Sequence, residues 1–268
     1  MQTVWKPFFS YNLWALFEPA IGQEQRHCPM KRGFLKARAK ELEVAPLIQQ
    51  ETVYQEIGLL AQQGIYEFHQ DVHCLIGDHG VNRVSAVLGL ENRSQEVRNR
   101  VTQVLANYQV TPILLGKNIL KLSRGDEGFP EPILLRSGNQ ECNLFAAIDC
   151  IFVEPDGTLH ILDFKTGKSD FDRRQAYVYL LAAKYLYPNQ EAIASFYNLE
   201  SQTWSDPICA SSVQLQVLEM DLFRFAQQHQ NDLQRYRRKL ASFEEIFPPH
   251  PGYQCQTCQF QSVCQFTI

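Results

Sequence analysis

Two aspartates and a lysine lie close together in the segment AAIDCIFVEPDGTLHILDFK, which spans residues 146–165. Asp149 lies in one apolar run. Asp163 and Lys165 lie in the next, on the same side because side chains alternate along a strand. Two buried carboxylates from adjacent strands suit Mg²⁺ or Mn²⁺, and a nearby lysine can position a hydroxide for attack on phosphorus. Taken alone, the same residues could instead form a buried Asp163–Lys165 ion pair that only fixes the strand register.

The surrounding sequence predicts the elements that must hold these residues in place. Pro155-Asp156-Gly157 is a turn signal between two apolar runs, which therefore form a hairpin. Apolar runs predict strands over 110–116, 132–137, 144–154, 159–165 and 193–200. Amphipathic patterns predict helices that start near Pro46, extend from Ser169 to about Tyr187, and cover about 211–243. The pattern is that of one α/β domain with peripheral helices.

The composition is that of an ordinary globular protein. The chain has 268 residues, of which 45% are hydrophobic and 20% charged, and its net charge is -4 at pH 7. No apolar run approaches the roughly 18–20 residues of a membrane span, and the N-terminus lacks the features of a signal peptide. We therefore expect a cytoplasmic protein with no membrane partner, in a reducing compartment where clustered cysteines hold metal more often than they form disulfides.

Gln175 and Tyr179 stand four residues apart on one face of the helix that follows the hairpin. The order of Asp149, DFKTG (163–167) and this Gln-x3-Tyr pair resembles the RecB-like branch of the PD-(D/E)XK nuclease superfamily. The resemblance implies a restriction-endonuclease-like α/β fold, with a mixed sheet flanked by helices, in a single nuclease domain over residues 1–268. It also weighs against the simple ion pair.

The resemblance further implies a role for each of these residues. Asp149 and Asp163 would bind Mg²⁺ or Mn²⁺ together with the backbone carbonyl of Phe164. Lys165 would be the catalytic lysine. Two more side chains would support the site or touch DNA, those of Gln175 and Tyr179.

One more metal ligand is implied on an early helix, where the family usually places a histidine four residues after a glycine. Here the histidine, His69, comes five residues after Gly64. At about 100° per residue, His69 lies roughly 80° from the centre of the apolar face of its helix, and Glu67 lies roughly 120° away. We therefore expect His69 to be the ligand, with Glu67 as the alternative.

Three cysteines occur within ten positions near the C-terminus, at Cys255, Cys258 and Cys264. A thiolate metal site usually has four ligands. The segment SYNLWALFE, followed by Cys28, resembles the opening of RecB-like nucleases in which this cysteine joins a C-terminal C-x2-C-x5-C motif to hold a [4Fe–4S] cluster. Spacing alone suits zinc equally well, and the resemblance favours iron–sulfur. The four-cysteine cluster would join the two ends of the chain, residues 1–40 and 245–268.

Two blocks of the chain are basic, KRGFLKARAK (31–40) and RYRRK (235–239). Taken alone, each is more simply a solvated helix face. Because both lie close in sequence to the predicted cluster, they could line the path of a DNA strand, with Phe34 and Tyr236 stacking on bases. The residues that we expect to contact DNA are Lys36, Arg38, Arg237 and Arg238.

These features together predict a metal-dependent deoxyribonuclease that hydrolyses phosphodiester bonds. Because RecB-like relatives often act as exonucleases, we expect a substrate of single-stranded DNA or DNA ends, in repair, recombination or CRISPR adaptation. A helicase or a CRISPR-adaptation protein would suit it as a partner. The alternative is a non-catalytic iron–sulfur or zinc DNA-binding subunit of a larger complex. The intact Asp149, Asp163 and Lys165 argue against that alternative.

Overall fold

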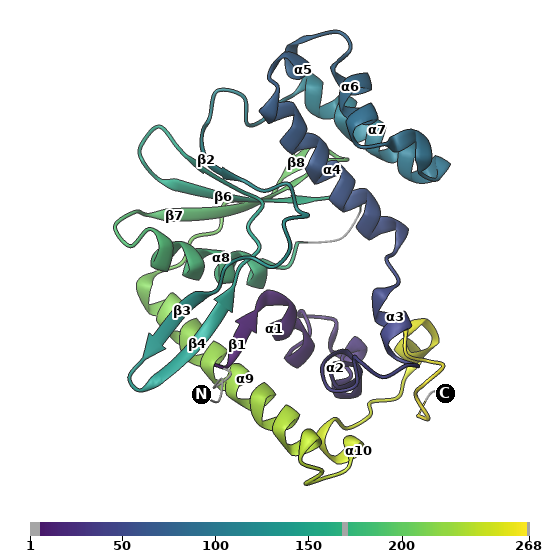
Figure 1. Ribbon diagram of the computed structural model, residues 1–268. Helices are drawn as coiled ribbons and strands as arrows, with labels where there is room; N and C mark the ends of the chain where they lie inside the picture. Colours follow the sequence, from purple (N-terminus) through teal and green to yellow (C-terminus); the bar gives the residue numbers. More distant parts are fainter. Residues whose placement is uncertain (1–5, 168–170, 267–268) are drawn as a thin grey trace, which may run out of the picture. The chain divides into compact units, whose positions relative to one another are not determined.

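The chain divides into two compact units, shown in Figure 1 as a computed structural model. The structure describes residues 6–167 and 171–266. One of the two units, which we call the central unit, comprises Glu51–Glu131 and Ala146–Leu215. The other, the terminal unit, comprises Met1–Gln50, Pro132–Phe145 and Gln216–Ile268. Because both units are assembled from separated segments, the expectation of a single nuclease domain stays a prediction.

A five-stranded sheet runs through the central unit, with the strand order β2-β5-β6-β7-β8. Strand β6 pairs antiparallel with β5 and parallel with β7, so the sheet is mixed, as the family resemblance implied. The strands are β2 (Asn118–Leu122), β5 (Cys150–Val153), β6 (Leu159–Lys165), β7 (Ala192–Asn198) and β8 (Thr203–Trp204).

The predicted hairpin is confirmed as the β5–β6 pair. Its turn is closed by a hydrogen bond from the Glu154 amide to the Thr158 carbonyl, and Gly157 adopts a φ of 92° that favours glycine. Every residue of β6 before Lys165 is buried, because this strand has neighbours on both edges and apolar cover on both faces.

Helix α8 (Arg173–Leu186) joins β6 to β7 and is the crossover that a parallel strand pair requires. Asp172 caps its start, since its side chain accepts a hydrogen bond from the Arg174 amide. The predicted cap, Ser169, lies outside the described residues. The buried positions of α8 include Ala176, Val178, Tyr179 and Leu180, so the helix buries the face that carries Tyr179.

The N-terminal part of the central unit is helical. Its longest helix, α4, begins with a capping box between Thr52 and Gln55. Apolar residues of α4 and α7 share one core with strand residues such as Phe152 and Leu162. The helices are α4 (Val53–Gln70), α5 (His73–Ile76), α6 (Gly80–Val87) and α7 (Gln95–Val110).

The terminal unit contains a three-stranded sheet in the order β1-β4-β3. Strand β4 pairs parallel with β1 and antiparallel with β3. The strands are β1 (Phe8–Ser10), β3 (Ile133–Ser137) and β4 (Gln140–Phe145). The helices are α1 (Tyr11–Phe17), α2 (Pro29–Lys36), α3 (Ala45–Gln49), α9 (Ser212–Arg237, most of which belongs here) and α10 (Phe243–Ile246).

The two ends of the chain pack together in the terminal unit through apolar side chains. Met30 and Phe34 of α2 form a buried cluster with Val44 and Phe260. The Phe34 and Phe260 rings are stacked, with their centroids 5.1 Å apart. A Cβ at Gly33 would lie 2.6 Å from an atom of the Phe243 ring, so α2 and α10 approach as closely as a glycine allows.

Several predicted boundaries are wrong. The run 110–116 is not a strand, because α7 continues to Val110, and the strand in this region, β2, begins only at Asn118. The predicted strand 144–154 is two strands, β4 and β5, which belong to different sheets. The helix expected from Pro46 is interrupted after Gln49, and the long C-terminal helix ends at Arg237 rather than near residue 243.

Helix α7 was not predicted, although its apolar residues recur with helical periodicity. Its buried residues follow helical spacing and are Val97, Val101, Val104, Leu105 and Tyr108.

None of the helices within the described ranges is both long and apolar enough to cross a membrane.

Candidate active site

Asp149 and Asp163 meet at the open end of the β5–β6 hairpin. Cys150 pairs with Leu162, so continuing the antiparallel register by one residue places Asp149 opposite Asp163. Asp163 is only 3% exposed. The backbone amide of Phe164 donates to Asp149 Oδ2 at 2.8 Å, which orients one carboxylate towards the other.

Asp163 is held by side chains from α8. Gln175 Nε2 and the Tyr179 hydroxyl each donate to Asp163 Oδ1, both at 2.8 Å. Gln175 Nε2 also lies 2.6 Å from the Tyr179 hydroxyl, and that hydroxyl oxygen lies 2.6 Å from the carbonyl oxygen of Ala147. The Gln-x3-Tyr pair therefore faces the hairpin end, and both residues contact the same carboxylate oxygen.

Lys165 contacts both Asp163 and Gln175. Its Nζ lies 2.6 Å from Asp163 Oδ2 and donates to Gln175 Oε1 at 2.9 Å. The lysine side chain is 27% exposed, while that of Asp163 is 5% exposed. The Asp163–Lys165 ion pair is thus present, but it is one part of a larger group of polar residues, and its lysine reaches the surface.

The surroundings of the two carboxylates disfavour their charged forms. Burial raises the pKa of Asp149 well above its ordinary value, and the negative charge of Asp163 raises it further. Burial also raises the pKa of Asp163, against the opposing effect of Lys165 and the Tyr179 hydrogen bond. One cationic side chain does not compensate two buried carboxylates, so the pair has the charge to bind a further cation.

The donor set fits a hard divalent cation. Asp163 Oδ2 is buried and faces the Lys165 ammonium, and it accepts no hydrogen bond from the other residues that the structure describes. Mg²⁺ is commonly bound by one or two carboxylates together with water and substrate phosphate, so Asp149 and Asp163 suffice as its protein carboxylates.

His69, the expected metal ligand on α4, makes its side-chain hydrogen bond with Tyr108 and not with these carboxylates. Its Nε2 is 2.7 Å from the Tyr108 hydroxyl, in the helical core, and burial lowers its pKa. The alternative, Glu67, pairs with Arg124 at 2.9 Å. Neither residue forms a ligand group with Asp149 and Asp163, because no three His, Cys, Asp or Glu side chains within the described ranges are arranged to hold a metal ion.

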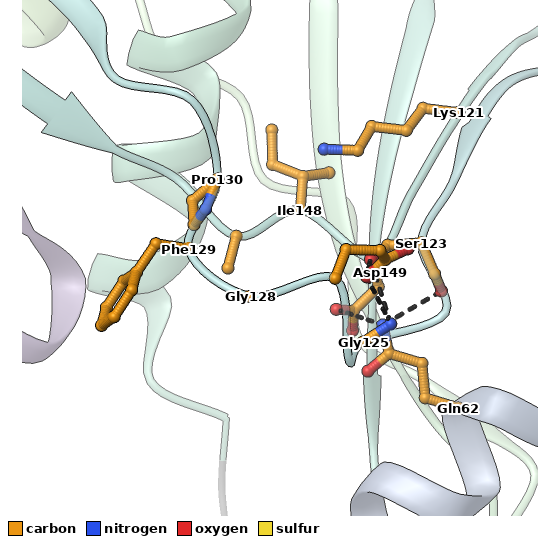
Figure 2. Close-up of a pocket in the computed structure, with 11 residues that line it drawn as sticks. Gln62, Lys121, Ser123, Gly125, Gly128, Phe129, Pro130, Ile148 and Asp149 are labelled. Atoms are coloured by element: carbon orange, nitrogen blue, oxygen red, sulfur yellow. Dashed lines mark hydrogen bonds between the residues drawn. The ribbon is translucent and has the colours of Figure 1, made fainter.

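Gln62 of α4 reaches the site, although no sequence motif indicated it. Its Nε2 donates to Asp149 Oδ1 at 3.1 Å and to the carbonyl of Ser123 at 3.2 Å (Figure 2). Gln62 comes four residues after Gly58, which is the spacing expected between the family glycine and its histidine. His69 lies two helical turns further along, about 10 Å away at 1.5 Å per residue.

The four cysteines expected at an iron–sulfur cluster lie in one part of the terminal unit. All four are half-buried and form no disulfide. Burial raises the pKa of the Cys264 thiol, and the nearby thiols of Cys28, Cys258 and Cys255 act in the same direction. Cys264 Sγ lies 3.7 Å from Met30 Sδ. The thiols thus share one neighbourhood, but within the described part of the chain they do not form a metal-binding group.

The predicted DNA-contacting residues are only partly accessible. Burial lowers the pKa of Lys36, and Arg38 pairs with Glu41 at 2.7 Å. Arg237 and Arg238 are exposed. The expectation that Phe34 stacks on bases is wrong, because Phe34 is only 2% exposed. Tyr236 is half-buried, and its hydroxyl donates to Glu41 at 3.2 Å.

The comparisons with known proteins give a family. A family model described as the PD-(D/E)XK nuclease superfamily matches residues 34–265. This range contains the candidate active site and the three C-terminal cysteines, and Cys28 precedes it. No curated protein matches the chain.

Two solved structures are distantly similar. One is a protein from Eubacterium rectale whose name gives exonuclease as a provisional assignment. Its identity is 9% and its TM-score 0.47, with 88% of this chain and 83% of that chain covered. The other, SSO0001, has 14% identity and a TM-score of 0.30, over 77% of this chain and 94% of that chain. Likenesses this weak carry no weight beside the family match.

Proposed function

Because the chain belongs to the PD-(D/E)XK nuclease superfamily, we propose that it hydrolyses DNA phosphodiester bonds with the help of a divalent cation. The observation that carries the proposal is the convergence of Asp149, Asp163 and Lys165 at one end of the hairpin, with the lysine 2.6 Å from one carboxylate. A purely structural ion pair would need neither the second buried carboxylate nor the amides that orient both.

In this proposal Asp149 and Asp163 would hold Mg²⁺ or Mn²⁺, with the carbonyl of Phe164 as a third oxygen. When bound, the cation would polarise the phosphate and lower the pKa of a coordinated water. Lys165, which contacts Asp163 and reaches the surface, would orient the attacking water. Gln175 fixes both partners of that pair, because it donates to Asp163 and accepts from Lys165.

Gln62 replaces the histidine that the RecB-like resemblance implied. A glutamine amide binds a cation only through its oxygen, and it is the nitrogen of Gln62 that faces Asp149, so we expect the two carboxylates to hold the metal. Gln62 would chiefly orient Asp149, since its Nε2 lies 3.1 Å from that carboxylate.

We propose single-stranded DNA or DNA ends as the substrate, as the RecB-like resemblance implies, with a partner protein such as a helicase supplying unwound strands. The same resemblance supports a [4Fe–4S] cluster on Cys28, Cys255, Cys258 and Cys264, with zinc as the alternative occupant. The four thiols are the right donors in kind, and Cys264 lies near the other three.

The experiment that tests this function separates cleavage from binding. Purified wild type is incubated with labelled single-stranded and duplex DNA in Mg²⁺, Mn²⁺ or EDTA. We expect cleavage only with metal. Lys165→Ala should abolish cleavage yet bind DNA almost as well, because one lysine contributes little to a contact with many phosphates. Lys184→Ala, an exposed lysine near the end of α8, is the matched control and should cleave normally.

An absence of metal-dependent cleavage in the wild type, with DNA binding retained, would contradict the proposed activity. It would favour the non-catalytic DNA-binding subunit instead.

A further inference from the structure

A loop of the central unit, residues 123–130, begins at the candidate active site. The Ser123 amide donates to the backbone carbonyl of Asp149 at 2.7 Å, and the Ser123 carbonyl accepts from Gln62. The loop therefore starts from the same residues that position the Asp149 carboxylate. Nothing in the sequence motifs pointed to this segment.

The loop is held in shape by Glu127. Its carboxylate accepts the amides of Arg124 at 2.6 Å and Gly125 at 2.8 Å, and the Ser123 hydroxyl at 2.8 Å. Partial burial would raise the pKa of Glu127, but these hydrogen bonds outweigh it and lower the pKa to about 2. Gly125 has a φ of 92°, and a Cβ there would lie 2.9 Å from the Gln62 side chain. The turn thus requires glycine and packs on Gln62.

A pocket of ≈ 280 Å³ opens between this loop, strand β2 and the segment 147–149. That volume is near the lower end of small-ligand pockets, which begin at about 300 Å³. Asp149 lines one side of it, and Phe129 and Pro130 form the opposite rim (Figure 2). The pocket therefore adjoins the carboxylate that we expect to hold the metal.

Two lining side chains have the chemistry of a nucleotide site. Phe129 is 95% exposed at the rim of the pocket, so its ring is accessible to a ligand. Lys121 extends over the pocket towards Ile148 and is the cationic side chain among its described lining residues (Figure 2). An aromatic face beside a cation is how proteins hold unpaired nucleotides, with the base on the ring and the phosphate at the cation.

We infer that this pocket, named here the β2 pocket, binds a single unpaired nucleotide of the substrate strand next to the scissile phosphate. The base stacks on Phe129, and Lys121 contacts its phosphate. The inference rests on the proposed nuclease function. It also gives a reason for preferring single strands, since a base inside a duplex is already stacked and cannot present its face to Phe129.

The test measures binding without metal, so that the DNA stays intact. Affinities for a short oligothymidine and for a duplex of equal length are measured in EDTA by fluorescence anisotropy. Phe129→Ala should weaken single-strand binding by roughly fivefold or more, because stacking on one aromatic side chain contributes about 1–3 kcal/mol per base. Phe129→Trp, which keeps an aromatic ring, should bind single strands as tightly as the wild type. Tyr54→Ala, at an aromatic residue that is 68% exposed but does not line the pocket, should have no effect.

The Lys121 contact has its own readout. The slope of log affinity against log salt is negative, and Lys121→Ala should make it shallower by about 0.7, the value expected for one phosphate contact on a single strand. Lys184→Ala is the matched control and should leave the slope unchanged.

The outcomes keep the inference and the proposed function apart. If the wild type cleaves DNA but Phe129→Ala and Lys121→Ala bind single strands as tightly as the wild type, the pocket assignment is wrong and the nuclease function stands. An equal loss for duplex and single strand would also overturn the assignment, because the pocket would then not select an unpaired base. If the wild type cleaves no DNA, the nuclease function fails whatever the pocket variants show.

Discussion

Replacing Tyr179 with Phe removes one oxygen atom and leaves the buried ring in place. The hydroxyl donates to Asp163 Oδ1 at 2.8 Å and lies 2.6 Å from the carbonyl of Ala147. Gln175 donates to the same hydroxyl and, independently, to Asp163. The variant thus withdraws one donor from a buried carboxylate while the other donor stays.

The magnitude follows from the charge on the acceptor. A hydrogen bond to a charged group contributes about 1.5–3 kcal/mol, so Tyr179→Phe should lower the free energy of unfolding at neutral pH by about that amount. At about 1.4 kcal/mol per pH unit, the same energy raises the pKa of Asp163 by about 1–2 units. Burial already raises this pKa, so the change adds to an existing shift. If catalysis needs the charged carboxylate, the acid limb of the pH–rate profile should move to higher pH.

The assay combines urea unfolding at neutral pH with initial cleavage rates across the pH range in Mg²⁺. Tyr177→Phe is the matched control, because Tyr177 lies on the same helix and is half-buried but makes none of these contacts. It should unfold and cleave like the wild type. If Tyr179→Phe matches the wild type in both stability and the position of the acid limb, the Tyr179 hydroxyl does not stabilise the charged form of Asp163.

Three further predictions concern other parts of the molecule. His229 is 2% exposed, and burial, together with neighbouring cations, lowers its pKa to about 4. The stability that the neutral ring contributes above its unfolded pKa is lost as the pH falls. The wild type should therefore lose roughly 2 kcal/mol between pH 7 and pH 5, whereas His229→Leu should not; equal slopes in acid unfolding would refute this. Protein purified without oxygen should contain about four irons per chain, and Cys28→Ala should lose them as completely as Cys258→Ala; one tightly held zinc would exclude the cluster but keep the site. Gln62→Ala should reduce the cleavage rate roughly tenfold with little change in DNA affinity, because it frees Asp149 on one side; an unchanged rate would show that Asp149 needs no such support.

The hairpin and its polar residues could be predicted because their signals are local. Asp163 and Lys165 lie on the same side of their strand because side chains alternate, and Pro155-Asp156-Gly157 predicts the turn between β5 and β6. The facing of Gln175 and Tyr179 follows from four-residue spacing on a helix, and both contact Asp163 in the structure. Here local periodicity and tertiary contact agree.

Other parts of the site depend on contacts that sequence spacing does not reveal. Gln62 is an uncharged residue on an amphipathic helix, and only its distance to Asp149 identifies it. His69 has the chemistry of a ligand, but the register of α4 directs it to Tyr108. The loop 123–130 owes its shape to Glu127 accepting backbone amides, a closure that composition does not indicate.

In the basic block 31–40, residues that the sequence suggested were at the surface are buried. The charge of this block and its place next to the predicted cysteine cluster suggested a DNA surface. However, Arg32 is 4% exposed and pairs at 2.8 Å with Asp232, which is 200 residues away in sequence. Part of the block therefore serves the core of the terminal unit, and Phe34 packs on Phe260 instead of facing solvent. Charge density alone does not separate these roles.

The most direct test of the central claim is metal-dependent cleavage of single-stranded DNA by wild type and Asp163→Asn under identical conditions. Asn keeps the shape of the side chain and an oxygen acceptor for Gln175 and Tyr179, and it removes the negative charge. If Asp163 holds a divalent cation by its charge, the wild type should cleave in Mg²⁺ or Mn²⁺ and Asp163→Asn should lose activity by at least about 100-fold. Cleavage by Asp163→Asn at the wild-type rate would contradict the account.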